Sequence, residues 1–563
     1  MMRRNPVQWL LVLLASAATA CGGEPGEPAP AGDVPAVPLD ALGYWPMAIG
    51  GGPLGDAEPV AGVVPVVREH AAAVGLIPVA DRELPPGLGD VQGWLNVARR
   101  FDPDELAGRV ILIDFWTAGC SNCIQMIPIL EKLGADFAGD PLLFIGVHSQ
   151  KFDEEASTDS IRKAMLILGV THPVALDTDK GAWQAWDVGA WPTFFLIDAR
   201  GRVCKYRVGG ASYDRLHDWI ESALAEGAAE GSLSRQLLGF LGRERDRVTP
   251  LSHPEKIAAT PDGYAVADTG HDRVVLVDAN GKLVDVVGDG TPGWADGAFS
   301  EARFSSPRGL AAQGDVVYVA DSENYRIRAI HRSTGQVTTL AGSGERGSVM
   351  GSLDALTTGL STPWDVTLAG DRLFVAVAGA HQLAELDVGS SRIVQVAGTG
   401  KEGLADGAAL AAKLAQPSGL VGVGGDVFFA DAESSSVRRL SLADQTVTTL
   451  VGKGLYSFGD VDGPASSALL QHPLGIAYGD GALFVADTYN SKLKRIDPAS
   501  GDTTTVYGSG DHEQLFEPGG LVFVAGSAGP YLLVADTGNH RILKVTVDGA
   551  SAEPWSIEGL TPP

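Results

Sequence analysis

Two different patterns of hydrophobic and polar residues divide the chain. From about residue 93, apolar runs of strand length alternate with stretches in which apolar residues recur every three or four positions. The run Arg109–Trp116 is typical of a buried parallel strand, and Ser121–Leu133 is expected to be a helix. Further strands are expected at Leu142–Val147, Thr193–Ile197 and Val203–Val208, and further helices at Asp159–Leu168 and Tyr213–Ala225. This order predicts an α/β domain over residues 86–230.

After a linker at 231–249, the pattern becomes repetitive. Six segments share a proline, a few apolar residues, a turn and a strand that typically ends in Ala-Asp; the prolines are Pro254, Pro307, Pro363, Pro417, Pro473 and Pro518. In four repeats the aspartate follows the proline by fourteen residues, whereas the third repeat has Val377 at this position. A repeat of about 50 residues suits four short strands, so residues 250–560 are predicted to form a six-bladed β-propeller.

Glycine enrichment supports this division. The chain has 72 glycines in 563 residues, and many stand in Gly-x-Gly or Asp-Gly pairs at the ends of the repeats, such as Gly288–Gly290 and Asp296-Gly297. Glycine adopts positive φ at no steric cost, so these pairs are interpreted as turns between strands.

The N-terminus has the pattern of an export signal. Arg3 and Arg4 precede a short apolar run that ends at residue 20, directly before Cys21. The sequence Ala18-Thr19-Ala20-Cys21 resembles the lipobox of bacterial lipoproteins, which implies a signal peptide at 1–20 and a lipidated Cys21. Residue 22 is Gly and not the Asp that tends to retain such lipoproteins at the inner membrane, so an outer-membrane anchor facing the periplasm is expected. The alternative is ordinary signal cleavage. Residues 21–40 are rich in Pro, Gly and Ala and are expected to form a flexible tether, and residues 41–85 receive no assignment.

Charge and cysteine content exclude several classes of protein. The formal net charge of −27 disfavours binding to nucleic acid, which needs a concentrated basic surface. Four cysteines in the whole chain exclude a disulfide-stapled scaffold. Cys204 lies on an expected strand and is interpreted as an inert core thiol.

The pair Cys120 and Cys123 is the candidate for chemistry. It follows the strand Arg109–Trp116 and opens the expected helix, where the helix dipole favours a thiolate on Cys120. Cys123 lies one helical turn away and can resolve a mixed disulfide by forming the Cys120–Cys123 bond. Half of a zinc site is the alternative, but the sequence holds no second pair of ligands, so no metal or cofactor is expected.

The residues at three further positions are those that thioredoxins have at the corresponding positions. Asp114 lies where thioredoxins keep a buried carboxylate that handles the proton of the resolving thiol, although a purely structural carboxylate remains the alternative. Pro128 lies where they kink the active-site helix. Trp191-Pro192-Thr193 has the form of their cis-proline turn, which faces the dithiol and implies a catalytic-site role for Pro192. The dipeptide Ser121-Asn122 differs from the usual Gly-Pro, so the direction of electron flow stays open.

Taken in order along both halves, the strings WLNVARR, IGVHSQKF, AWPT, TPWDV, QPSGL and LQHPLG resemble the NHL repeat-containing protein 2 family. The resemblance implies a thioredoxin-like domain joined to a six-bladed NHL propeller. It also implies a motif Cys-Cys-x-Asn-Cys, in which the first cysteine is Gly119 here.

Basic residues recur five positions after the Ala-Asp position of the repeats. They are Arg273, Arg326, Lys492 and Arg541. One interpretation is a ring that docks an acidic peptide or ligand around the central channel, and the alternative is that each pairs with a neighbouring acid. His148, His381 and His472 lack metal-ligand spacing and are interpreted as structural.

The hypothesis that unites these features is a thiol-disulfide oxidoreductase of the bacterial cell envelope. Its substrate would be a protein or peptide thiol or disulfide, recruited by the propeller, and it would meet the membrane only through the lipid anchor. The alternative is a non-catalytic binding or scaffold lipoprotein in which the dithiol is structural.

Overall fold

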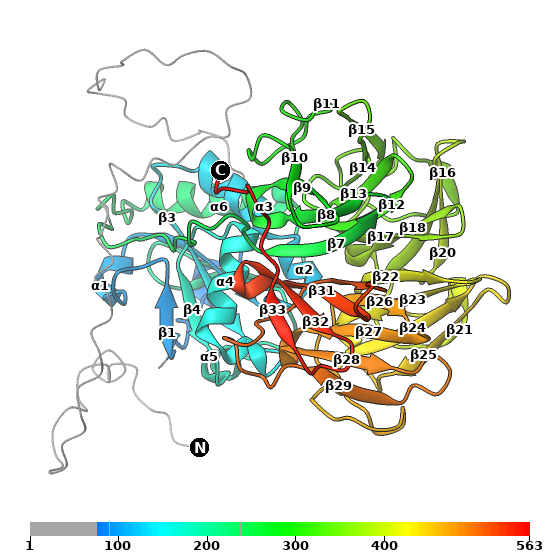
Figure 1. Cartoon of the computed structure of the whole chain (residues 1–563). Helices are drawn as coiled ribbons and strands as arrows, with labels where there is room; N and C mark the ends of the chain where they lie inside the picture. The colour runs from blue at the N-terminus through cyan, green and yellow to red at the C-terminus, as the bar shows by residue number, and fades with distance from the viewer. Residues whose placement is uncertain (1–75, 89–90, 237) are drawn as a thin grey trace, which may run out of the picture. The chain divides into compact units, whose positions relative to one another are not determined.

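The computed structural model describes residues 76–563 except 89, 90 and 237. The predicted signal peptide, the lipidated Cys21 and the tether at 21–40 lie outside the described residues. None of the helices in the described part is long and apolar enough to cross a membrane. The described residues form an α/β domain followed by a β-propeller (Figure 1).

The α/β domain is built on a six-stranded sheet in the order β1-β4-β3-β2-β5-β6. The strands are β1 (Gly93–Leu95), β2 (Val110–Trp116), β3 (Leu142–Ser149), β4 (Val174–Asp177), β5 (Thr193–Ile197) and β6 (Val203–Val208). The helices are α1 (Pro103–Leu106), α2 (Ser121–Ile124), α3 (Ile127–Asp136), α4 (Thr158–Leu168), α5 (Gly181–Ala185) and α6 (Tyr213–Ala229). β2 is the central strand, parallel to β3 and antiparallel to β5, and all of its residues are buried. Helices α3 and α6 pack on one face of this sheet, so the thioredoxin-like fold is confirmed.

Two predicted elements differ from the structure. The helix expected at Ser121–Leu133 is divided into α2 and α3, because Pro128 lacks an N–H and can only occupy the first turn of a helix. The segment 231–249 was expected to be a linker, but part of it packs into the α/β domain. Leu238 and Phe240 are buried in the core of the α/β domain, where Phe240 packs edge-on against Phe101.

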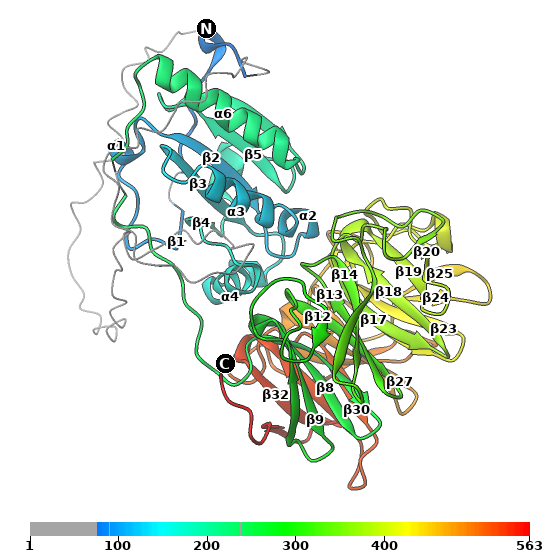
Figure 2. The ribbon, with the colours of Figure 1, turned by 90° about the horizontal axis from the view of Figure 1, so that it is seen from above.

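The propeller has six blades, and in each blade four strands follow one another from the axis outward. In blades 2, 3 and 4 a short strand that precedes these four in the chain pairs at the outer edge. Blade 1 comprises β7 (Pro254–Thr260), β8 (Gly263–Asp268), β9 (Arg273–Asp278) and β10 (Leu283–Val287); blade 2 comprises β12 (Pro307–Gln313), β13 (Val316–Asp321), β14 (Arg326–His331), β15 (Gln336–Ala341) and the short β11 (Gly297–Ala298). Blade 3 comprises β17 (Pro363–Ala369), β18 (Arg372–Val377), β19 (Gln382–Asp387), β20 (Arg392–Ala397) and β16 (Ser352–Asp354); blade 4 comprises β22 (Pro417–Val423), β23 (Asp426–Asp431), β24 (Ser436–Ser441), β25 (Thr446–Val451) and β21 (Gly407–Ala408). Blade 5 comprises β26 (Gly475–Gly479), β27 (Ala482–Asp487), β28 (Lys492–Ile496) and β29 (Thr503–Tyr507), and blade 6 comprises β30 (Leu521–Val524), β31 (Tyr531–Asp536), β32 (Arg541–Thr546) and β33 (Ala552–Pro554). In Figure 1 and Figure 2 the blades can be followed by colour from green through yellow and orange to red.

The repeated aspartate has a structural explanation. Its carboxylate accepts the backbone N–H of the residue two positions before the proline of the same blade, as in Asp431 with Ala415 at 2.8 Å. The same bond is made by Asp268, Asp321, Asp487 and Asp536. The spacing of fourteen therefore reflects one hydrogen bond that fixes how the chain enters the innermost strand.

A second repeated feature joins neighbouring blades. The residue before each proline has positive φ, and the six residues are His253, Ser306, Thr362, Gln416, His472 and Glu517, which we call the axial ring. At five seams the backbone N–H of the ring residue donates to a side chain of the preceding blade, as from Gln416 to His381 Nδ1 at 3.1 Å. The bond from His253 to His540 closes the circle between blades 6 and 1.

Candidate active site

The two candidate cysteines lie where β2 passes into α2. Cys120 is the N-cap of α2 and is half-buried, whereas Cys123 is buried inside its first turn. Both are free thiols in the structure. Burial, and then the neighbouring Cys120, raise the pKa of Cys123 well above its usual value. This thiol needs a nearby base before it can act as a nucleophile.

Asp114 is the titratable group placed to serve Cys123. It is buried on β2, and its Oδ1 makes no hydrogen bond within the described part of the chain. Burial raises the pKa of Asp114 to about 8, and its charge is one of those that act on Cys123. Asp114 is therefore protonated at neutral pH and able to exchange a proton near that range.

Pro192 lies at the start of β5, and the Trp191–Pro192 peptide bond is cis, as the sequence motif predicts. Trp191 packs in the same hydrophobic cluster as Cys120 and Cys123, and its indole N–H donates to the carbonyl of Ser149 at 3.0 Å. The cis-proline turn and the dithiol thus belong to one packed unit.

Glu155 holds the loop before Cys120, and sequence analysis did not identify it. The carboxylate is buried and accepts the backbone N–H groups of Gly119 at 2.7 Å, Lys151 at 2.7 Å and Phe152 at 3.0 Å. It joins the residue that precedes Cys120 to the loop that follows β3. A lone glutamate in a loop carries no sequence signal for such a role.

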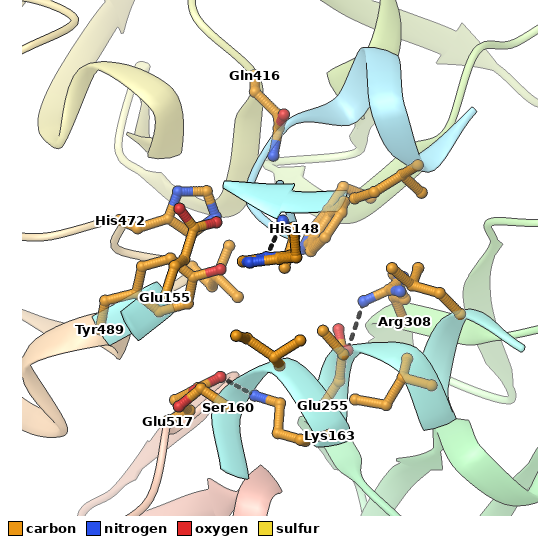
Figure 3. A pocket seen from close by; sticks show the side chains of 18 residues that line it. His148, Glu155, Ser160, Lys163, Glu255, Arg308, Gln416, His472, Tyr489 and Glu517 are labelled. Atoms are coloured by element: carbon orange, nitrogen blue, oxygen red, sulfur yellow. Dashed lines mark hydrogen bonds and ion pairs between the residues drawn. The ribbon is translucent and has the colours of Figure 1, made fainter. Parts of the chain in front are cut away.

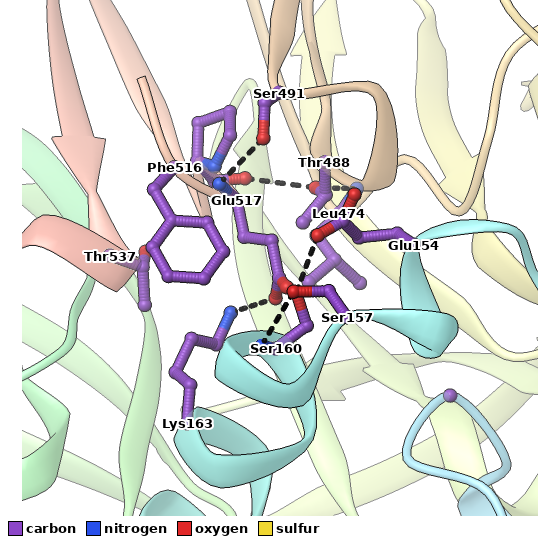
Figure 4. Close-up of polar contacts among 12 residues, drawn as sticks. Glu154, Ser157, Ser160, Lys163, Leu474, Thr488, Ser491, Phe516, Glu517 and Thr537 are labelled. Carbon is purple, nitrogen blue, oxygen red and sulfur yellow. Dashed lines mark hydrogen bonds and ion pairs between the residues drawn. The ribbon is translucent and has the colours of Figure 1, made fainter. Parts of the chain in front are cut away.

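The axial ring of the propeller meets this region of the α/β domain. Gln416 Oε1 accepts the backbone N–H of Ser121, the residue after Cys120, at 2.7 Å. Lys163 of α4 forms a buried ion pair with Glu517 (Figure 4). At Gly119, a Cβ atom would lie 3.2 Å from the ring of His472. The polar residue before each repeat proline is the sequence signal that marks the ring, but it does not show what each ring residue contacts.

Residues outside the ring extend the contact. Lys151 forms a buried ion pair with Glu433, which lies between β23 and β24. Phe152 is fully buried and packs against Phe458, His472 and Tyr489, with ring centroids 5.0, 4.9 and 5.5 Å away. The propeller therefore covers the side of the dithiol formed by residues 119–125 and 151–153.

A cavity of about 60 Å³ lies between α4 and the axial ring (Figure 3). His148, Arg308, Gln416, His472 and Glu517 line it, and each has one buried polar atom without a hydrogen-bond partner in the described residues. His148 Nε2 accepts the N–H of Ala118 at 3.1 Å, and burial lowers the pKa of His472 to about 3. The lining thus combines apolar side chains with several buried polar atoms that lack partners, and ordered water molecules could satisfy these atoms.

The four predicted docking cations are not free to bind an acidic ligand. Arg273 pairs with Asp268 at 2.7 Å, Arg541 pairs with Asp536 at 2.6 Å, and Lys492 pairs with Asp460. Arg326 stacks on Trp294, with 4.1 Å from its guanidinium carbon to the ring centroid, and donates to two backbone carbonyls. The alternative interpretation, pairing with neighbouring acids, describes three of the four.

The remaining candidates are structural. Cys204 is fully buried on β6, and burial raises its pKa to about 12. Within the described residues, two groups of three side chains come close enough together to hold a metal ion: Asp246, His253 and His540, and His217, Asp218 and Glu221. In the first group, His540 Nδ1 already accepts the His253 N–H at the blade seam. A ring nitrogen used in this way leaves the other nitrogen protonated and so unable to bind a metal ion.

Comparison with known proteins agrees with this architecture. Residues 97–218 match the Redoxin family, and residues 304–330 match the NHL repeat. The chain is 37% identical to human NHL repeat-containing protein 2 over 507 residues, which cover 82% of this chain and 69% of the human protein. The chain belongs to the NHL repeat-containing protein 2 family. The resemblance expected from the sequence is therefore confirmed.

Other relatives share one or both domains. The protein SUPPRESSOR OF QUENCHING 1, chloroplastic, of Arabidopsis thaliana is 34% identical over 515 residues, covering 84% of this chain and 48% of that protein. The thiol-disulfide oxidoreductase ResA of Bacillus subtilis is 28% identical over 122 residues, covering 22% of this chain and 65% of that protein. This similarity to a named thiol-disulfide oxidoreductase covers about a fifth of the chain.

Proposed function

We propose that this chain is a thiol-disulfide oxidoreductase whose dithiol is Cys120 and Cys123. The observation that carries the proposal is the site itself: a half-exposed N-cap cysteine, a buried second cysteine and a buried carboxyl group, Asp114, whose pKa is about 8. A buried carboxyl group without a hydrogen-bond partner on Oδ1 costs stability, so a role in proton transfer explains its presence better than packing does.

The reaction proceeds by two exchanges. The Cys120 thiolate attacks a substrate disulfide, and a mixed disulfide forms while one substrate thiolate leaves. Cys123 loses its proton to a base and attacks Cys120 Sγ, which releases the second substrate thiolate and leaves the Cys120–Cys123 disulfide. The substrate gains two electrons and the protein dithiol loses two. The reverse sequence oxidises a substrate dithiol.

Trapping tests this proposal. A Cys123→Ser variant cannot resolve the mixed disulfide and is expected to accumulate covalent adducts with protein partners, seen as mass increases that a reductant removes. The matched control, Cys120→Ser with Cys123→Ser, should form none. Absence of adducts, together with a wild-type dithiol that exchanges with neither oxidised nor reduced glutathione, would favour the scaffold alternative.

The propeller is proposed to recruit the protein partner as well as to cover the dithiol. Both kinds of domain suggest protein interaction. Because Ser121, Lys163 and Phe152 of the same chain already contact the ring and its neighbours, recruitment falls to surfaces outside the ring. Partners captured by the trapping variant are the candidates for this contact.

The location is proposed from the N-terminal sequence: a lipid anchor on Cys21 that holds the protein at the periplasmic side of the outer membrane. A Cys21→Ser variant is expected to move from the membrane fraction to the soluble fraction, because one lipid-modified residue provides the attachment. Metabolic labelling with a fatty acid analogue measures the modification directly. Labelling that persists in Cys21→Ser would contradict the proposal.

A further inference from the structure

We propose that Gln416 of the propeller is a positioning residue of the dithiol, through which blade 4 sets the reactivity of Cys120. The inference rests on the proposed exchange activity and assigns part of its regulation to the other domain. Gln416 Oε1 accepts the N–H of Ser121 at 2.7 Å, and both residues are buried. Since Ser121 directly follows Cys120, the propeller binds the backbone of the redox motif itself.

The backbone of Gln416 is fixed independently of this contact. Its φ is 65°, which is uncommon for a residue other than glycine and costs conformational energy. Its N–H donates to His381 Nδ1 at 3.1 Å, and Pro417 follows it at the start of β22. The side chain is therefore presented to Ser121 from a rigid seam between two blades.

The Gln416 amide also leaves a donor unused. Oε1 accepts from Ser121, whereas Nε2 has no hydrogen-bond partner in the described residues and is buried beside the cavity. A buried amide donor without a partner favours negative charge nearby. The side chain thus takes up an N–H next to Cys120, while its own unused donor lies at the cavity.

A second contact from blade 4 also makes the Cys120 thiolate less favourable. Lys151 is buried, and the Cys120 and Cys123 thiols are among the groups that act on its charge. Its ammonium is paired with Glu433, which lies two residues after Asp431. The pairing withholds a positive charge from the dithiol, so blade 4 governs both the hydrogen bonding and the charge around it.

Two substitutions at Gln416 separate positioning from simple packing. Gln416→Glu keeps the acceptor for Ser121 and adds a negative charge, which disfavours the thiolate. Gln416→Met keeps the approximate shape, removes the acceptor and frees the Ser121 N–H. In the reduced full-length protein at pH 7, alkylation of Cys120 by iodoacetamide is expected to be about tenfold slower in Gln416→Glu. It is expected to be faster than wild type in Gln416→Met, because the Ser121 N–H next to Cys120 is then free to stabilise the thiolate.

The readout is the alkylation rate of the peptide that contains Cys120, followed by mass spectrometry. Gln336→Glu is the matched control, because Gln336 is exposed on the outer strand β15, and it should leave the rate unchanged. Circular dichroism and the thermal unfolding midpoint confirm that each variant folds, and a variant that unfolds is replaced by Glu433→Gln, which frees Lys151 and should speed alkylation.

Any other order of rates overturns the inference. A Gln416→Glu rate equal to wild type, or the same loss in both Gln416 variants, would show that the contact only packs the domains together. The failure of the proposed function is a separate result. In that case the wild-type dithiol exchanges with neither form of glutathione, whatever the order of alkylation rates.

Discussion

Replacing Asp114 with asparagine is expected to raise the free energy of unfolding by about 4 kcal/mol at pH 7. The carboxyl group is buried, and its pKa is about 8 in the folded chain, against about 3.9 in an unfolded one. Between these values the unfolded chain carries a charge that the folded chain lacks. Stability therefore falls by about 1.4 kcal/mol for each pH unit from pH 4 to pH 8 and then levels off.

Asparagine has nearly the same shape and cannot ionise, so the variant should lose this pH dependence. Urea denaturation of the full chain, followed by tryptophan fluorescence at pH 4 and pH 7, measures it. The free energies of unfolding of wild type and Asp114→Asn should be nearly equal at pH 4 and differ at pH 7. Asp177→Asn is the matched control. The buried Asp177 carboxylate accepts three hydrogen bonds, so its replacement should lower the free energy of unfolding. The donors are Ser149, Ala182 and Trp183.

The same variant should be slower in exchange. At pH 8, where about half of the Asp114 groups are ionised, resolution of the mixed disulfide is expected to slow by about 10²-fold in the variant, because no carboxylate is left to take the Cys123 proton. This is the lower end of what general base catalysis contributes. If the variant is more stable at pH 7 but its rate of thiol-disulfide exchange is unchanged, Asp114 has only a structural role. Sequence analysis gave this role as the alternative. Stability that is unchanged at both pH values would contradict the burial argument itself.

The sequence predicted features that depend on local periodicity. The strand β2, the cysteine pair after it and the cis-proline turn all follow from short motifs, and the blades follow from the regular distance between Pro417 and Asp431. These signals are visible because a turn, a cap or a hairpin imposes its requirement on residues that are close in the chain.

The role of the four recurring basic residues of the propeller was left open between docking and ion pairing, and the geometry of the β-hairpin explains why. A residue five positions after the aspartate stands opposite it across a tight turn, so that Asp268 faces Arg273 and Asp536 faces Arg541 in the strand register. The spacing therefore places the cation opposite the aspartate, and Arg273 and Arg541 form ion pairs across the hairpin. The sequence showed the regular recurrence of the cations but not this register.

The contacts of the dithiol with the propeller could not be predicted, because they join residues about 300 to 350 positions apart. Gln416, His472 and Glu517 share a position in their repeats but differ in chemistry, and each side chain suits what the α/β domain presents to it. Ser121 presents an N–H, Gly119 leaves room for an aromatic ring, and Lys163 brings a cation. This complementarity appears only when both domains are folded and in contact.

A Phe152→Ala variant is expected to loosen that contact. Phe152 is fully buried against Phe458, His472 and Tyr489, and its ring would lie 3.2 Å from a Cβ at Gly119. Removing a buried phenylalanine costs about 3–5 kcal/mol, and here the cavity would open between the domains beside Cys120. Alkylation of Cys120 and proteolysis within residues 241–249 should therefore speed up. Phe304→Ala, which removes an equally buried ring from the propeller core, should destabilise the chain without exposing the dithiol. Equal exposure in both variants would mean that the contact does not shield Cys120.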